Sequence, residues 1–139
     1  MKVKMDKQIG IGTEFFHKLI EENKYYVDKT MLLRTVFQDN GAEVLLITRP
    51  RRFGKTLTMS TFHDFLALNP DNPEDLSRQE LWFKDTAIFS DREFCRKYMG
   101  RFPVIFISLK YNFPNCIAHP SSYSTLFFFG RPLFFFGAF

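Results

Sequence analysis

The sequence predicts an α/β fold in which helices flank a parallel β-sheet, and two patterns support this prediction. Residues 43–48 and 103–109 are nearly continuous apolar runs of strand length. Strands that are buried on both faces, as in a parallel sheet, have this unbroken apolar composition. Before and between these runs, apolar residues recur at helical spacing. An alternation of helices with buried strands is typical of α/β domains.

Two helices are expected before the first strand. Thr13 is a suitable N-cap for a helix over residues 14–23, whose apolar side chains fall on one face. Asp28 or Thr30 is the expected cap of a second helix. Asn40-Gly41 should end this helix, because a left-handed residue commonly closes the last turn.

Two further helices are expected between the strands. The first begins at Lys55 or Thr56, and a loop over residues 70–77 follows it. Ser90 with Glu93 fits a capping box for a short helix that leads into the second strand.

Composition divides the chain near residue 110. The 139 residues include 19 Phe, 19 Lys+Arg and 15 Asp+Glu, for a net charge of +4. Residues 1–110 hold 11 Phe and 33 of the 34 charged residues, whereas residues 111–139 hold 8 Phe and a single charge, Arg131. A folded domain carries about 25% charged residues along its whole length. We therefore expect one domain over residues 8–110 and a Phe-rich aberrant or disordered tail over residues 111–139. The 11 Phe of the first part occupy expected core positions, such as Phe15, Phe62, Phe65 and Phe106.

Several classes of protein are excluded by composition. The apolar content of residues 1–110 is too high for intrinsic disorder. Cys95 and Cys116 form no C-x-x-C pair, so we expect neither a zinc module nor a disulfide scaffold. The N-terminus lacks the apolar core of a signal peptide, and no stretch reaches the ~18–20 apolar residues of a spanning helix. A cytoplasmic protein without a membrane partner is expected.

The segment between the first strand and the next helix carries the most specific motif. It reads Thr48-Arg49-Pro50-Arg51-Arg52-Phe53-Gly54-Lys55-Thr56. The phosphate-loop (Walker A) pattern is G-x-x-x-x-G-K-[ST], so its second half is intact while Arg49 stands at the first glycine position. The position after an apolar strand and at the start of an amphipathic helix is the context that this motif requires.

Each residue of the motif has a physical role in binding ATP and Mg²⁺. Gly54 allows the backbone to turn tightly and approach a phosphate. The amides that follow lie at a helix N-terminus, which favours an anion. Lys55 would reach the β- and γ-phosphates, and the Thr56 hydroxyl would coordinate a magnesium ion.

The basic residues around this motif allow other interpretations. Arg49, Arg51 and Arg52 are candidate phosphate contacts together with Phe53, or they form a solvated basic turn. With Lys55 they would also suit a basic module that binds nucleic acid. The three His, at positions 17, 63 and 119, are interpreted as surface or core residues.

A phosphate loop hydrolyses ATP only when a nearby strand ends in an acidic residue that holds magnesium and positions water. The second apolar run ends Ile107-Ser108-Leu109-Lys110, and no Asp or Glu follows Glu93. Hydrolysis by this chain alone is therefore not expected, and whether the protein is an enzyme is left open.

Three separated segments together resemble the N-terminal part of the bacterial AAA-ATPase-like family. They are Y-Y-V-D-K-T at 25–30, L-I-T-R-P-R-R-F-G-K-T-L at 46–57 and F-P-V-I-F-I-S-L-K at 102–110. Arg at the first glycine position is normal in that family. The resemblance implies an ATP-binding P-loop NTPase fold with the phosphates at residues 54–56.

Members of that family are usually longer. They continue into an acidic magnesium-binding strand and often into a restriction-endonuclease-like nuclease domain. This sequence departs from the family pattern after Lys110. The expectation is an incomplete, truncated P-loop domain, with a non-functional gene remnant as the alternative.

Overall fold

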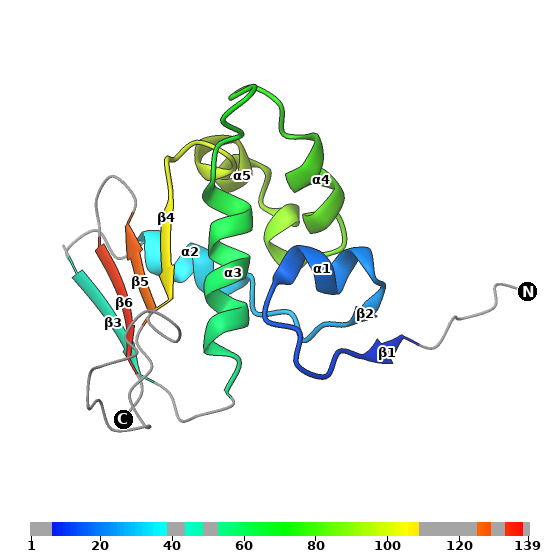
Figure 1. Ribbon diagram of the computed structural model, residues 1–139. Coiled ribbons are helices and arrows are strands. Elements are labelled where there is room, and N and C mark those ends of the chain that lie inside the picture. The colour runs from blue at the N-terminus through cyan, green and yellow to red at the C-terminus, as the bar shows by residue number, and fades with distance from the viewer. Residues whose placement is uncertain (1–6, 39–43, 49–52, 109–124, 129–132, 138–139) are drawn as a thin grey trace, which may run out of the picture.

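The computed structural model describes residues 7–38, 44–48, 53–108, 125–128 and 133–137 (Figure 1). The elements in chain order are β1 (Gln8–Ile9), α1 (Phe16–Glu21), β2 (Lys24–Tyr25), α2 (Met31–Gln38), β3 (Val44–Thr48), α3 (Lys55–Leu66), α4 (Ser77–Phe83), the 3₁₀ helix η1 (Ala87–Ser90), α5 (Arg92–Tyr98), β4 (Ile105–Ser108), β5 (Thr125–Phe128) and β6 (Leu133–Gly137). None of the helices among these residues combines the length and apolar character needed to span a bilayer.

The larger sheet is mixed, which corrects the expectation of a parallel sheet. Its strand order is β3-β6-β5-β4. β3 and β6 are parallel, whereas β5 is antiparallel to both β6 and β4. Only residues 129–132 separate β5 from β6, and a connection this short joins antiparallel strands. The two strands predicted from the apolar runs, β3 and β4, therefore do not pair with each other (Figure 1).

Both inner strands of this sheet come from the Phe-rich segment after residue 110. The division of the chain into a domain and a tail at that residue stays a prediction. The smaller sheet consists of β1 and β2, which pair in parallel with Ile9 opposite Tyr25.

Helix α3 is the central element of the structure. It lies between the larger sheet and the helices α1 and α4 (Figure 1), and it contacts α1, α4 and β5. Its buried face carries Phe62 and Phe65, both fully buried. The expectation that these two residues lie in the core is confirmed.

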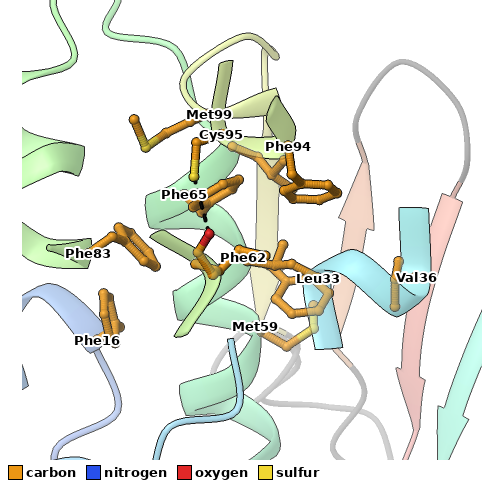
Figure 2. Close-up of a cluster of buried hydrophobic side chains, with 12 residues drawn as sticks. Phe16, Leu33, Val36, Met59, Phe62, Phe65, Phe83, Phe94, Cys95 and Met99 are labelled. Atoms are coloured by element: carbon orange, nitrogen blue, oxygen red, sulfur yellow. Dashed lines mark hydrogen bonds between the residues drawn. The ribbon is translucent and has the colours of Figure 1, made fainter. Parts of the chain in front are cut away.

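Aromatic side chains from several helices fill the core around α3 (Figure 2). The Phe83 ring lies 4.7 Å from the Phe16 ring and 5.1 Å from the Phe65 ring, measured between centroids. Phe94 lies 5.9 Å from Phe65 on the other side. Each fully buried side chain of this size contributes about 1.5–3 kcal/mol through removal of apolar surface from water. Phe106 is partly buried against the same cluster.

Some expected helix boundaries are wrong. α1 begins at Phe16, not at residue 14, and Phe15 is its N-cap in extended backbone. Phe15 is therefore outside the helix and 42% exposed, which corrects its expected core position. Thr13 does not cap α1; its hydroxyl accepts a hydrogen bond from Lys24 Nζ at 3.4 Å.

The expected capping box of α5 is also wrong. Ser90 belongs to η1, and the N-cap is Asp91. The Asp91 carboxylate accepts a hydrogen bond from the Phe94 amide at 3.1 Å. Helix α4, which follows the expected loop, was not predicted. The expected end of α2 at Asn40-Gly41 lies outside the described residues.

Candidate functional site

The backbone turns sharply at Gly54, immediately before α3. Gly54 has φ 76° and ψ 24°, a left-handed conformation that glycine adopts at little cost. Its carbonyl accepts hydrogen bonds from both the amide and the hydroxyl of Thr58, each at 2.9 Å. These two bonds fix the first turn of α3 directly after the left-handed residue.

The described residues leave space beside Gly54 on the side where a side chain would project. Among them, a Cβ placed on Gly54 would have one neighbour within 4 Å, the Lys29 ammonium at 3.7 Å. A ligand atom can therefore approach this backbone closely, with a cation beside it. This geometry fits the phosphate of a nucleotide.

Lys29 reaches the loop from the segment between β2 and α2. Its Nζ donates a hydrogen bond to the Phe53 carbonyl at 3.3 Å and lies 5.9 Å from the centroid of the Phe53 ring. Sequence reasoning missed Lys29 as a site residue. The signal was present, because the Y-V-D-K-T segment at 25–30 is one of the three segments that carry the family resemblance.

The start of α3 favours an anion. Lys55 and Thr56 are the first two residues of the helix, and both are partly exposed. The first amides of an α-helix have no partner within the helix, and the helix dipole adds partial positive charge there. No acidic residue lies in the first turn of α3.

The structure thus describes four of the seven predicted site residues as one continuous segment. They are Phe53, Gly54, Lys55 and Thr56. Arg49, Arg51 and Arg52 lie outside the described residues.

A pocket of about 410 Å³ adjoins this segment. Phe53, Gly54 and Thr58 line it from the start of α3, and Ile9 and Tyr25 line it from the small sheet. It lies between the β1–β2 pair and the beginning of α3, two parts of the molecule that appear in Figure 1.

Asp28 holds the Lys29 segment in place. One carboxylate oxygen accepts hydrogen bonds from the Thr30 amide at 2.8 Å and hydroxyl at 2.6 Å, and the other accepts one from the Ala87 amide at 2.7 Å. Partial burial acts to raise the pKa of Asp28, but these hydrogen bonds outweigh it and lower the pKa below its usual value. Asp28 therefore connects the start of α2 to η1.

A second polar cluster lies on another part of α3. The Asp64 carboxylate, 5% exposed, accepts hydrogen bonds from the His17 amide at 3.0 Å and contacts the Nδ1 atoms of His17 at 3.0 Å and of His63 at 3.1 Å. Sequence reasoning missed this cluster. His17 is 47 positions from Asp64, and no local pattern connects them.

Neither this cluster nor any other described group supplies three His, Cys, Asp or Glu residues placed to hold a metal ion. Cys95 is buried, and its thiol donates to the Ile88 carbonyl at 3.4 Å. Burial raises the pKa of this thiol, which disfavours the reactive thiolate.

The strand beside β3 carries no carboxylate. β6 pairs with β3 so that Gly137 lies opposite Thr48, at the end of β3 that leads toward Gly54. Its sequence is L-F-F-F-G, and no acidic residue follows Glu93 in the chain.

Residues 10–120 match the model of a protein family described as "Predicted AAA-ATPase". This range contains all three motif segments, at 25–30, 46–57 and 102–110. No curated protein and no solved structure matches the chain.

Proposed function

The chain belongs to the predicted AAA-ATPase family, and we propose that it binds ATP with Mg²⁺ at the Gly54-Lys55-Thr56 segment. The observation that carries this proposal is the left-handed Gly54 at the start of α3, where the Lys29 ammonium is the one described group, apart from the chain neighbours of Gly54, within 4 Å of a Cβ position. Glycine in this conformation, between a strand and a long helix, is typical of segments whose helix N-terminus faces a phosphate.

Each residue of the segment would make a different contact with the bound ligand. The amides of the first turn of α3 would hold the phosphates, and Lys55 would supply a mobile positive charge at the β- and γ-phosphates. The Thr56 hydroxyl would be the chain's ligand for Mg²⁺, which arrives with the nucleotide. Contacts from Arg49, Arg51 and Arg52 stay predictions.

We further propose that ATP is bound without rapid hydrolysis. Hydrolysis in P-loop proteins depends on an acidic residue that holds magnesium and on a group that orients water. β6, which lies beside β3, has no carboxylate, and β4 has none. The chain's own residues therefore support binding more than turnover.

Titration of the full chain with a fluorescent ATP analogue in the presence of Mg²⁺ tests the proposal. We expect Lys55→Ala to raise the Kd at least tenfold, since hydrogen bonds to charged groups contribute about 1.5–3 kcal/mol and each 1.4 kcal/mol is tenfold. Lys84→Ala is the matched control, because Lys84 is exposed at the end of α4 and is not among the described residues that line the pocket beside Gly54. An unchanged Kd in the Lys55 variant would refute the assignment.

A further inference from the structure

A second pocket is lined by α1, the second half of α3, α4 and the segment that leads into β4, four parts of the chain that appear in Figure 1. We call it the histidine pocket, because His17 of α1 and His63 of α3 line it together with Asp64. Its volume is about 510 Å³. Sites for small molecules have volumes of about 300–1,000 Å³, so this pocket is large enough to hold one.

Asp64 determines which nitrogen of each imidazole carries the proton. Its side chain is almost completely buried, and its oxygens lie 3.0 Å from His17 Nδ1 and 3.1 Å from His63 Nδ1. A carboxylate at Nδ1 keeps the proton of a neutral imidazole on that nitrogen, which leaves Nε2 as a hydrogen-bond acceptor. Neither Nε2 atom has a partner among the described residues, and both rings are partly exposed. A ligand in the pocket therefore meets two imidazole acceptors, while the charge of Asp64 stays covered.

Gln79 of α4 adds a buried acceptor. It is 6% exposed and lines the same pocket. Its Nε2 donates a hydrogen bond to the Ala67 carbonyl at 3.0 Å, which fixes the orientation of the amide, since the reverse orientation would set two oxygens against each other. Its Oε1 has no hydrogen-bond partner among the described residues. An acceptor left unpaired in this way is unfavourable, and a ligand N–H would remove that cost.

Arg78 supplies the pocket with a positive charge. It precedes Gln79 on α4, is exposed, and forms no ion pair with another described residue. A guanidinium can bind a carboxylate through two parallel hydrogen bonds. Much of the remaining lining is apolar or aromatic and includes Leu68, Trp82 and Val104. The pocket thus combines one cation, several acceptors and an apolar wall.

We propose that the histidine pocket binds an N-acyl amino acid with an apolar side chain, either as a free compound or as the C-terminal residue of a peptide. The carboxylate pairs with Arg78, and the amide N–H beside it donates to Gln79 Oε1 or to an imidazole Nε2. The apolar side chain packs on the wall that includes Trp82. The site is independent of the proposed nucleotide site, because the histidine pocket and the pocket beside Gly54 share no described residue.

Trp82 makes this proposal directly testable. It is the single Trp of the chain and it lines the pocket, so its indole N–H gives one NMR signal that reports on occupancy. We expect N-acetyl-L-leucine to shift this signal saturably when it is titrated into the full chain. N-acetyl-L-leucinamide lacks the charge and isocaproate lacks the N–H. Each should bind about fivefold more weakly or worse, because each loses a hydrogen bond to a charged or buried group.

A substitution on α4 tests the role of the cation. Arg78→Ala should raise the Kd of N-acetyl-L-leucine about tenfold and change that of the amide by less than about twofold. Arg96→Ala is the matched control, because Arg96 is exposed on α5 and is not among the described residues that line the pocket. It should leave both affinities unchanged. Both substitutions are at exposed positions, where the effect on stability is usually small.

A peptide distinguishes the two sources of the ligand. The acetylated tripeptide Ala-Ala-Leu presents the same C-terminal group with more chain before it. Tighter binding of this tripeptide than of N-acetyl-L-leucine would assign the pocket to a peptide C-terminus, and equal or weaker binding would assign it to the free compound.

Three results would overturn the proposal. They are equal affinities for N-acetyl-L-leucine, its amide and isocaproate, equal losses in Arg78→Ala and Arg96→Ala, and the absence of any saturable shift of the Trp82 signal. None of these results bears on the binding of ATP at the start of α3, which is measured separately.

Discussion

Lys29 Nζ lies 3.3 Å from the Phe53 carbonyl oxygen, so the segment before α2 meets the residue before Gly54. The two residues are 24 positions apart in the chain. The contact places a flexible cation at the start of α3 without using Lys55. It also gives a structural reason why the Y-V-D-K-T and F-G-K-T motifs occur together in one sequence.

Replacing Lys29 should weaken the binding of any phosphate-bearing ligand. We expect Lys29→Met to raise the Kd of ATP and of tripolyphosphate by roughly the same factor, about fivefold to tenfold, through loss of one charge-assisted contact. Lys84→Met is the matched control. Titration calorimetry at two salt concentrations measures the effect, which should shrink as salt screens the charge. Unchanged affinities for both ligands would mean that Lys29 only holds the loop.

Gly54→Ala should reduce both stability and ATP affinity. Among the described residues the new Cβ would have one neighbour, Lys29 Nζ at 3.7 Å, which is ordinary van der Waals contact, so the expected cost arises from the left-handed backbone. That cost is about 1–2 kcal/mol for a residue other than glycine.

Gly12→Ala is a matched control for this variant. Gly12 also has φ 76°, and a Cβ there would meet none of the residues that the structure describes within 4 Å. Urea unfolding should show a similar loss of stability for both variants, whereas ATP titration should show weaker binding only for Gly54→Ala. Equal ATP affinity in the two variants would argue against phosphate binding at Gly54.

Local patterns in the sequence predict the start of α3 and two of its buried residues well. Helical periodicity and the Gly-Lys-Thr signal place the beginning of α3 at Lys55 or Thr56, and in the structure it begins at Lys55. Phe62 and Phe65 are correctly expected in the core for the same reason. These features depend on residues that are close together in the chain, so the spacing of apolar residues predicts them directly.

Features that depend on distant residues could not be predicted in this way. The apolar runs at β3 and β4 predict strands but do not specify their partners, which β5 and β6 supply. Lys29 reaches Phe53 across 24 positions, and His17 reaches Asp64 across 47 positions where α1 packs against α3. The expected core position of Phe15 is wrong for a local reason. Helix boundaries inferred from apolar spacing can be misplaced by a few residues.

Asp28→Asn should lower stability at neutral pH and have little effect in acid. The pKa of Asp28 in the folded chain lies below its ordinary value of 3.8, so the carboxylate stabilises the fold above that pH. The contribution is lost as the pH falls through the lowered pKa. At neutral pH we expect a loss of about 1–2 kcal/mol, the scale of hydrogen bonds to a charged acceptor at a partly exposed position.

Urea unfolding at pH 7 and at pH 2–3 measures this pH dependence. Asp71→Asn, in an exposed loop, is the control and should change stability by less than about 0.5 kcal/mol at either pH. If Asp28→Asn lowers the free energy of unfolding by the same amount at both pH values, the stabilising role of the charged Asp28 carboxylate is contradicted.

Asp64→Ala should be strongly destabilising, because Asp64 accepts one of the hydrogen bonds that connect α1 to α3. Its loss leaves the His17 amide, whose hydrogen bond is 3.0 Å long, without that partner in a partly buried position. It also removes the contacts to both imidazoles. We expect a loss of about 2–3 kcal/mol, the cost of leaving buried polar groups unsatisfied. Asp64→Asn should lose less, since its amide oxygen still accepts one hydrogen bond.

Urea unfolding followed by circular dichroism measures both Asp64 variants against Asp71→Ala. ATP affinity serves as a second readout. Because the cluster lies near the opposite end of α3 from Gly54, Asp64→Asn should bind ATP with an unchanged Kd at temperatures where it is folded. If the urea midpoint of Asp64→Ala equals that of Asp71→Ala, Asp64 does not join α1 to α3. A folded variant that has lost ATP binding would instead show that the cluster helps to position the start of α3.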